Sequence, residues 1–527
     1  MSFTTFSFIL FFAALFLLYY RIPSRFQWIL LLGASWLFYA FASPGYLLLV
    51  VGVIGWTYWG ATGIGRVYEK RDERIKGVTR EEKRAIRTEA ERSARLVLSG
   101  VVIGLVLLLG FFKYLQFAYD NLRAVLNVLP LVDFSLPTHS FSIILPVGLS
   151  FYVFQTIGYC VDVYREMEVP ERNFWRYSLF VSYFPQILQG PIGNYGRLSG
   201  QLFAGHQFEY DQAVLGLQRV GWGFFKKLMV ANHISLVTDP IWANYSDCHG
   251  WPVWTILLVL YAIWIYADFS GYMDIACGCS QMLGIKIDEN FNCPYLAKNI
   301  PDYWRRWHMT LSSWFRDYLF YPVLRSDFGA RIRKFLPGRY LPTLIPTTIA
   351  LSIVWFTTGL WHGASWGYVA WGLYYGVFMI LAVVLEPVYT HIRQRFPNLT
   401  DSRGYAVFQV FRTFAIVVIG YALFAPGDLS VSWVVFRRMG EGICQSSFVD
   451  FCRPHWRKLI IPFVGSLAML AVDVIHYCSG EQCVVRRKIR AFPFSVRWTV
   501  YLLSLLAMFL WGAYGIASLN KFAYFQF

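Results

Sequence analysis

The chain is a succession of apolar runs of helix length, separated by short polar or basic stretches. About 20 apolar residues in a helix cross the roughly 30 Å hydrocarbon layer of a membrane. Hydrophobic residues make up 57% of the chain and charged residues only 15%, far from the balance of a soluble domain. We therefore expect an all-α integral membrane protein, a polytopic bundle of about twelve spanning helices with additional re-entrant or interfacial helices.

No linker, internal repeat or low-complexity tract divides the chain, so we expect one membrane domain over residues 1–527. The first apolar run lacks the basic start and small-residue cleavage site of a removed signal peptide, so we expect it to be retained. The expected spans are Ser2–Tyr20, Trp28–Phe41, Tyr46–Ile64, Leu96–Ala118, Phe141–Cys160, Gly221–Val237, Val253–Leu283, Pro342–His362, Tyr368–Leu385, Tyr405–Phe424, Leu459–Tyr477 and Val500–Ile516.

The segment Tyr177–Leu202 is too polar, and too often interrupted by proline and glycine, for a span that faces lipid. Irregular backbone at membrane depth is tolerated only where protein or water satisfies its polar groups. We therefore expect a re-entrant or cavity-lining element there.

The formal net charge is +16, but the basic residues lie in short clusters between the apolar runs. In that position they set the topology and contact anionic membrane lipids, so we expect no nucleic-acid binding. The longest hydrophilic stretch, Arg66–Arg95, fits a solvated helix with charge pairs four residues apart. We favour a structural arm over a binding site for this segment.

Short basic loops stay in the cytoplasm, and placing the 66–95 arm there puts both ends of the chain outside. The tail 521–527 is then extracytoplasmic. The same topology would place a second basic cluster on the outer side, against the rule that basic loops stay in the cytoplasm. This cluster therefore indicates an interfacial helix or a miscounted span. This cluster consists of Arg437, Arg438, Arg453, Arg457 and Lys458.

Common catalytic and ligand-binding motifs are missing or out of context. The nine cysteines show no zinc-type spacing, so no metal site is expected, and there is no Walker motif or dinucleotide fingerprint. A GxSxG match at Gly363–Gly367 lies in an apolar helical run, without the strand-turn-helix context of a nucleophile elbow. We interpret this match as coincidence.

Two histidines stand in this apolar setting, His308 after a Trp-Arg-Arg-Trp run and His362 inside a helix-length run. An imidazole at membrane depth needs a polar partner or a wet cavity. It can take a proton from a hydroxyl that attacks an ester or thioester, and then pass the proton to the leaving group. Arg305, Arg306 and Arg316 could bind a phosphate or a developing oxyanion. The alternative is that each histidine only forms a hydrogen bond between helices.

Two carboxylates, Asp268 and Asp274, lie six residues apart in another apolar run. On a helix this spacing places them on different faces, so they do not form an obvious catalytic pair. We favour a structural role, in which they satisfy arginine or backbone groups inside the bundle, over a proton relay.

The two histidines, the three arginines and Asp268 lie in motifs through which the sequence resembles the membrane-bound O-acyltransferases. The resemblance is in particular to the bacterial branch that acetylates alginate and peptidoglycan or transfers D-alanine to teichoic acids. The motifs occupy about residues 140–375 in order. They are Leu145-Pro-Val-Gly-Leu-Ser-Phe-Tyr152, Phe184-Pro-Gln-Ile-Leu-Gln-Gly-Pro191, Asp268-Phe-Ser-Gly-Tyr272, Asn290-Phe-Asn-Cys-Pro-Tyr295, Trp304-Arg-Arg-Trp-His-Met-Thr-Leu-Ser-Ser-Trp314, Phe315-Arg-Asp-Tyr318 and Gly359-Leu-Trp-His-Gly-Ala364.

The resemblance implies a helical bundle around a tunnel that joins a cytoplasmic donor side to an outer acceptor side. His362 corresponds to the catalytic histidine of the family, and His308 to its partner. The tail resembles an aromatic motif in which Tyr524 carries the acyl group; an interfacial anchor is the alternative. The motif residues that we assign to substrate binding are Arg305, Arg306, Trp304, Trp307, Ser312, Trp361, Asn290 and Gln189.

The resemblance therefore implies an enzyme in the cell membrane of a bacterium, with no bound cofactor and with acetyl-CoA as the cosubstrate. We expect an extracytoplasmic SGNH-type transferase or a glycan as the acceptor, and an acyl-CoA or acyl carrier as the donor. D-Alanyl transfer remains an alternative. A proton-coupled transporter or flippase that uses Asp268, Asp274 and the histidines is a third hypothesis.

Overall fold

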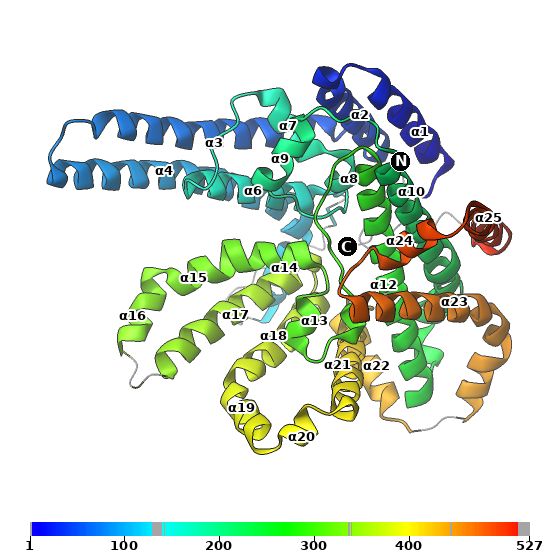
Figure 1. The fold of residues 1–527 in the computed structure, drawn as a ribbon. Helices are drawn as coiled ribbons and strands as arrows, with labels where there is room; N and C mark the ends of the chain where they lie inside the picture. Colours follow the sequence, from blue (N-terminus) through cyan, green and yellow to red (C-terminus); the bar gives the residue numbers. More distant parts are fainter. Residues whose placement is uncertain are drawn as a thin grey trace. The chain divides into compact units, whose positions relative to one another are not determined.

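The computed structural model describes residues 3–128, 140–141, 143–335, 338, 340–442 and 445–514. In this part of the chain every regular element is a helix, apart from one isolated antiparallel bridge between Phe291 and Trp307 (Figure 1). The predicted all-α architecture is therefore confirmed. The predicted acyl-carrying Tyr524 and the tail 521–527 lie outside the described residues.

Eight helices in the described chain are long and apolar enough to cross a membrane. They are α3 (Leu47–Arg74), the continuous run of α4 (Arg80–Leu109) and α5 (Leu115–Val128), α12 (Trp251–Met282), α17 (Leu341–His362), α18 (Trp366–Val384), α21 (Arg403–Phe424), α23 (Gln445–Ser479) and α25 (Phe494–Trp511). Membrane-spanning character is thus confirmed, whereas the count of about twelve and the tunnel stay predictions.

Three further apolar helices have only 16 residues each: α1 (Phe6–Arg21), α2 (Gln27–Ala42) and α6 (Leu149–Tyr164). The remaining helices are α7 (Phe174–Ser182), α8 (Phe184–Ile187), α9 (Tyr195–Phe203), α10 (Tyr210–Phe225), α11 (Asn232–Ala243), α13 (Ile300–Trp304), α14 (Met309–Phe315), α15 (Tyr321–Arg325), α16 (Asp327–Phe335), α19 (Glu386–Arg395), α20 (Pro397–Thr400), α22 (Leu429–Met439) and α24 (Val484–Ala491).

The chain divides into two compact units. Unit 1 comprises Met1–Ala213 with Cys279–Asp288, and unit 2 comprises Val214–Gly278 with Glu289–Phe527. Both histidines of interest belong to unit 2, whereas the Phe184–Pro191 motif belongs to unit 1.

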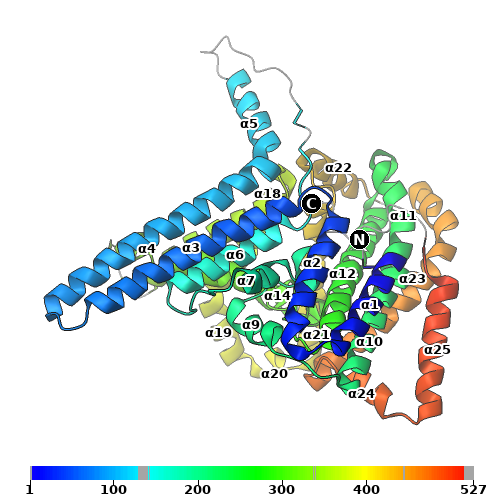
Figure 2. The ribbon, with the colours of Figure 1, turned by 90° about the horizontal axis from the view of Figure 1, so that it is seen from above.

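In unit 1 the charged arm is a helical hairpin. Helix α3 continues to Arg74 and α4 starts at Arg80, so the two run side by side (Figure 2). Thr79 caps α4 in a reciprocal capping box with Glu82, which satisfies two backbone N–H groups at the turn. The sequence prediction of one solvated helix over residues 66–95 was therefore wrong in form, because a five-residue turn divides the segment.

The motif Phe184–Pro191 of unit 1 forms the short helix α8 and an irregular turn, flanked by α7 and α9. Its residues are buried throughout. Gly148, with a φ of +78°, approaches this turn so closely that a Cβ there would lie 2.1 Å from the carbonyl oxygen of Ile187. The predicted break in the helix is confirmed, and its re-entrant placement stays a prediction.

In unit 2, α10 and α11 are joined through a π-helical turn at Lys226–Ala231, and this continuous run packs against α12. The contact depends on glycine, because a Cβ at Gly223 would lie 2.5 Å from the carbonyl oxygen of Gly271 on α12. Such close approach of two helix backbones is typical of small residues at helix interfaces in membranes. It places the polar side chains of α10 directly against α12.

The histidine-bearing helix α17 pairs with α18 in unit 2 by the same means. A Cβ at Gly359 would lie 2.4 Å from the carbonyl oxygen of Tyr368, so the end of α17 lies against the start of α18. Helix α21 packs on α18 in turn. The end of α17, with His362, is thereby enclosed by aromatic side chains.

Gly223→Ala is expected to lower the melting temperature of the purified protein in detergent, because overpacking at such a contact typically costs about 1–3 kcal/mol. Gly221→Ala is the matched control on the same helix, since nothing lies within 4 Å of a Cβ there. Alanine also favours the helix over glycine, so the control should melt at or above the wild-type temperature. Equal melting of both variants would contradict the packing described here.

Candidate active site

His308 stands where the chain turns from a short extended segment into α14. Residues 290–292 and 306–309 run antiparallel: Asn292 N donates to Arg306 O at 2.9 Å, and Met309 N donates to Asn290 O at 3.0 Å. His308 has a φ of +47°, in the left-handed region that costs a non-glycine residue roughly 1 kcal/mol or more. The backbone pairing on both sides holds it in this conformation.

The side chain of Asn290 lies beside the His308 imidazole. Its Oδ1 is 3.1 Å from His308 Nδ1, 3.0 Å from Thr310 N and 3.0 Å from Thr310 Oγ1. Its Nδ2 faces the Met273 sulfur at 3.4 Å. Asn290 and His308 are each only 1% exposed, so this hydrogen bonding takes place away from solvent.

Aromatic rings cover the remaining faces of His308. Phe269 of α12 meets the imidazole edge-on with ring centroids 4.9 Å apart, and Trp361 of α17 lies at 6.0 Å. His308 is outside the candidate spans, and burial lowers the pKa of its imidazolium. Burial therefore keeps this ring neutral and able to accept a proton.

His362 is the last residue of α17 and is 3% exposed. Its ring packs edge-on against Trp371 at 4.8 Å and Phe424 at 5.3 Å. Trp361 contacts His362 at 4.9 Å as well as His308. The two predicted catalytic imidazoles thus share one indole neighbour and lie in the same cluster of aromatic rings in unit 2.

Some of the other predicted substrate-binding residues contact this aromatic cluster, and others lie away from it. Trp304 packs on Trp371, which itself contacts His362, and Trp307 packs on Phe291 beside Asn290. Ser312 lies one turn into α14, where its backbone N–H donates to His308 O. Gln189 is 1% exposed and belongs to unit 1, where neither polar atom of its side chain has a hydrogen-bond partner in the described structure.

The predicted anion-binding arginines have partners other than the two imidazoles. Arg306 forms an ion pair with Asp302 at 3.0 Å and lies over the Tyr477 ring. The side chain of Arg305 is 72% exposed, and Arg316 pairs with the adjacent Asp317. A role in binding the anionic part of a donor stays a prediction for these residues.

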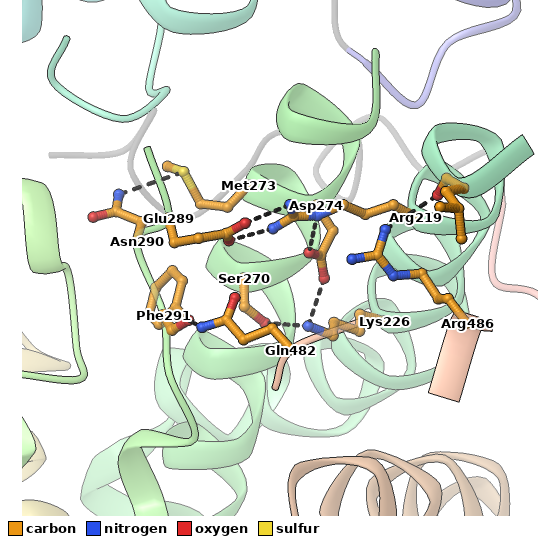
Figure 3. Close-up of polar contacts among 11 residues, drawn as sticks. Arg219, Lys226, Ser270, Met273, Asp274, Glu289, Asn290, Phe291, Gln482 and Arg486 are labelled. Carbon is orange, nitrogen blue, oxygen red and sulfur yellow. Dashed lines mark hydrogen bonds and ion pairs between the residues drawn. The ribbon is translucent and has the colours of Figure 1, made fainter. Parts of the chain in front are cut away.

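A cluster of partly buried charges in unit 2 connects α10, α12 and the Asn290 segment (Figure 3). Arg219 of α10 donates to Asp274 at 2.9 Å and to both oxygens of Glu289, at 2.7 and 2.5 Å. Lys226 donates to Asp274 at 2.8 Å and to Ser270 at 3.0 Å.

Lys227, the next residue along, pairs with Asp268 at 2.5 Å, and both side chains are almost completely buried. The two predicted carboxylates therefore have separate cationic partners. These pairs fit the structural role that the sequence favoured, and a proton relay stays the alternative.

Comparison with known proteins identifies the family. The sequence model of the membrane-bound O-acyltransferase family matches residues 172–425, which include both imidazoles, Asn290 and the charged cluster. A probable alginate O-acetylase of Azotobacter vinelandii is 33% identical over 440 residues, covering 83% of this chain and 78% of that protein. The chain belongs to the membrane-bound O-acyltransferase family.

Two further relatives show the breadth of this family. A peptidoglycan O-acetyltransferase of Helicobacter pylori is 30% identical over 450 residues, 80% of this chain and 75% of that protein. A teichoic acid D-alanyltransferase of Bacillus subtilis is 29% identical over 282 residues, 53% of this chain and 68% of that protein. Membership confirms the predictions of the family and of an acyltransferase.

Sequence reasoning missed the cationic partners in this acyltransferase, Arg219, Lys226 and Lys227, and the carboxylate of Glu289. A signal was present, because two consecutive lysines interrupt the predicted span Gly221–Val237, and intramembrane charges mark paired or functional groups. In the GxSxG match, which we interpreted as coincidence from the sequence alone, the hydroxyl of Ser365 donates to Gly427 O and accepts from Gly367 N at the start of α18.

Lys227→Met is expected to destabilise the acyltransferase strongly, because it leaves the Asp268 carboxylate buried without this cation, at a cost of about 3–5 kcal/mol. The double variant Lys227→Met/Asp268→Leu should recover most of the loss in melting temperature. Arg316→Met breaks an exposed pair and is the control, with an expected change within about 1 kcal/mol. A double variant as unstable as Lys227→Met would show that the pair itself is not the cause.

Proposed function

We propose that this acyltransferase moves an acetyl group from a cytoplasmic thioester, acetyl-CoA, toward hydroxyl groups of an extracytoplasmic polysaccharide, as a multi-pass protein of a bacterial cell membrane. The observation that carries the proposal is the pair of buried imidazoles, His308 and His362, which both contact the Trp361 ring. The relatives matched over more than three quarters of this chain are named as acetylases of alginate and peptidoglycan, which supports acetyl transfer to a glycan.

In the proposed reaction a hydroxyl oxygen attacks the thioester carbonyl while an imidazole takes the hydroxyl proton. The carbon–sulfur bond breaks, the proton passes to the departing sulfur, and the products are an acetyl ester and a free thiol. His362 acts as this base, with His308 as its partner. The apolar walls exclude water, which would otherwise hydrolyse the thioester.

We further propose that the first acceptor is the phenol of Tyr524, from which the acetyl group passes to a glycan or to an extracytoplasmic SGNH-type transferase. Each transfer exchanges one ester or thioester bond for another, so no oxidant or additional energy source is required. Membrane lipids surround the protein, and the donor thioester arrives from the cytoplasmic side.

D-Alanyl transfer is the second candidate, because the teichoic acid D-alanyltransferase of Bacillus subtilis is 29% identical to the matched part of this chain. That match covers 53% of the chain, against 80–83% for the acetylases, and this difference favours acetyl over D-alanyl. Comparing thioester consumption with acetyl-CoA and with a D-alanyl carrier thioester tests the choice.

His362→Ala is expected to lower acetyl-CoA consumption by purified protein in proteoliposomes by about 100-fold or more, the usual contribution of a general base. His391→Ala, an exposed substitution on α19, is the matched control and should retain full activity. Free thiol release measures the rate, and melting temperature checks that both variants fold. Full activity of folded His362→Ala would contradict the proposed role of this imidazole.

Intact-protein mass spectrometry after incubation with acetyl-CoA tests the relay. The wild type is expected to gain one acetyl group, whereas Tyr524→Phe gains none because it lacks the accepting phenol. Equal acetylation of Tyr524→Phe and wild type would exclude this acceptor. Absence of both acetylation and thiol release in the wild type would exclude acetyl-CoA as the donor.

A further inference from the structure

The orientation of the Asn290 amide is fixed by the backbone. A peptide N–H can only donate a hydrogen bond, so the Asn290 atom 3.0 Å from Thr310 N must be the acceptor, the carbonyl oxygen Oδ1. The flipped amide would place an NH2 group against this N–H. Asn290 Nδ2 accordingly faces the Met273 sulfur, a weak acceptor, at 3.4 Å.

The same oxygen lies 3.1 Å from His308 Nδ1. Because Oδ1 has no hydrogen to donate, Nδ1 must be the donor and must carry a proton. A neutral imidazole has only one such proton, so Nε2 is then unprotonated. Burial favours the neutral ring over the imidazolium. The backbone N–H of Thr310 therefore orients the Asn290 carboxamide, and this carboxamide in turn determines the tautomer of His308.

We propose that Asn290 is a positioning residue of this acyltransferase, which holds His308 as the Nδ1-protonated tautomer and so makes Nε2 its basic nitrogen. The use of that nitrogen in acyl transfer rests on the proposed function, whereas the tautomer rests on the contacts alone. This role differs from the substrate-binding role that the sequence assigned to Asn290, and its side-chain oxygen faces protein donors.

Asn290 is itself held from both sides. Its backbone carbonyl accepts from Met309 N, and the preceding residue, Glu289, is clamped through both carboxylate oxygens by Arg219 (Figure 3). Arg219 also donates to Asp274 of α12. Asp274 directly follows Met273, whose sulfur faces Asn290 Nδ2. The charged cluster thus anchors the segment that sets the imidazole.

The elements packed against His308 carry other titratable groups that bear on its protonation. Asp274 pairs with Arg219 and Lys226, and Glu289 pairs with Arg219. Asp268 pairs with Lys227, and Arg306 pairs with Asp302. The Arg305 side chain is 72% exposed, and His362 lies on α17. Burial is the cause of the lowered pKa of His308. A charge placed at position 290 should therefore act on this ring directly.

The tautomer can be measured without any substrate. Protein labelled with ¹⁵N-histidine in lipid bilayers is examined by solid-state NMR at neutral pH, and the His308 signals are identified by their loss in His308→Gln. We expect a protonated Nδ1 and an unprotonated Nε2 in the wild type and in Thr310→Val, which keeps the orienting backbone N–H. A ring protonated at Nε2 in the wild type would overturn the proposal, even if transfer activity is found.

The pH dependence of acetyl-CoA consumption tests the consequence. Asn290→Asp keeps the acceptor oxygen and the Thr310 contacts but adds a negative charge beside Nδ1–H, which stabilises the imidazolium and raises the pKa of His308. The reaction needs the neutral ring of His308. As the pH is lowered, the rate of Asn290→Asp should therefore begin to fall at a higher pH than the rate of the wild type. At alkaline pH the two rates should be similar. Asn290→Leu should lose about 10-fold or more at every pH.

Each outcome has one meaning. An Asn290→Asp profile that overlays the wild type, or a folded Asn290→Leu variant with full activity, would overturn the positioning role. If Asn290→Leu does not fold, the shift of the pH profile in Asn290→Asp and the NMR signals of His308 still test the positioning role. Absence of wild-type activity with an Nδ1-protonated ring would contradict the proposed function and leave the tautomer assignment standing.

Discussion

The side-chain oxygen of Asn290 is the contact on which the geometry of the candidate site depends. In an apolar bundle each buried polar atom needs a partner, because water is not there to replace one. One carbonyl oxygen receives Thr310 N, Thr310 Oγ1 and His308 Nδ1 within 3.1 Å. The start of α14, the left-handed turn at His308 and the direction of its imidazole are thereby determined together.

The surrounding structure holds that oxygen in place at an energetic cost. Moving charges such as Arg219 and Asp274 out of water costs desolvation energy that their mutual attraction only partly recovers, so this cluster is weak evidence of added stability. The glycine contact between α10 and α12, at Gly223, brings the cations within reach. Close helix packing, paired charges and a positioned imidazole therefore form one continuous arrangement within unit 2.

The sequence predicted the helical membrane fold because apolar length is a local property, and it predicted His308, His362 and Trp361 because their motifs are contiguous. It could not show that Asn290 positions His308, because that depends on the backbone N–H of Thr310, twenty residues further along the chain. The arm at residues 66–95 was predicted as one helix because its charge spacing is helical on both sides of the turn. Arg305 and Arg306 were grouped with His308 by proximity in sequence, whereas the structure directs them elsewhere.

The central claim is that His308 and His362 act as one unit around Trp361. The most direct measurement is a double-mutant comparison of acetyl-CoA consumption by His308→Ala, His362→Ala and the doubly substituted protein, each confirmed as folded by its melting temperature. Residues that act as a unit are strongly non-additive, so the double variant should be no slower than the slower single variant. Losses that multiply in the double variant would show that the two imidazoles act independently, and would contradict the account.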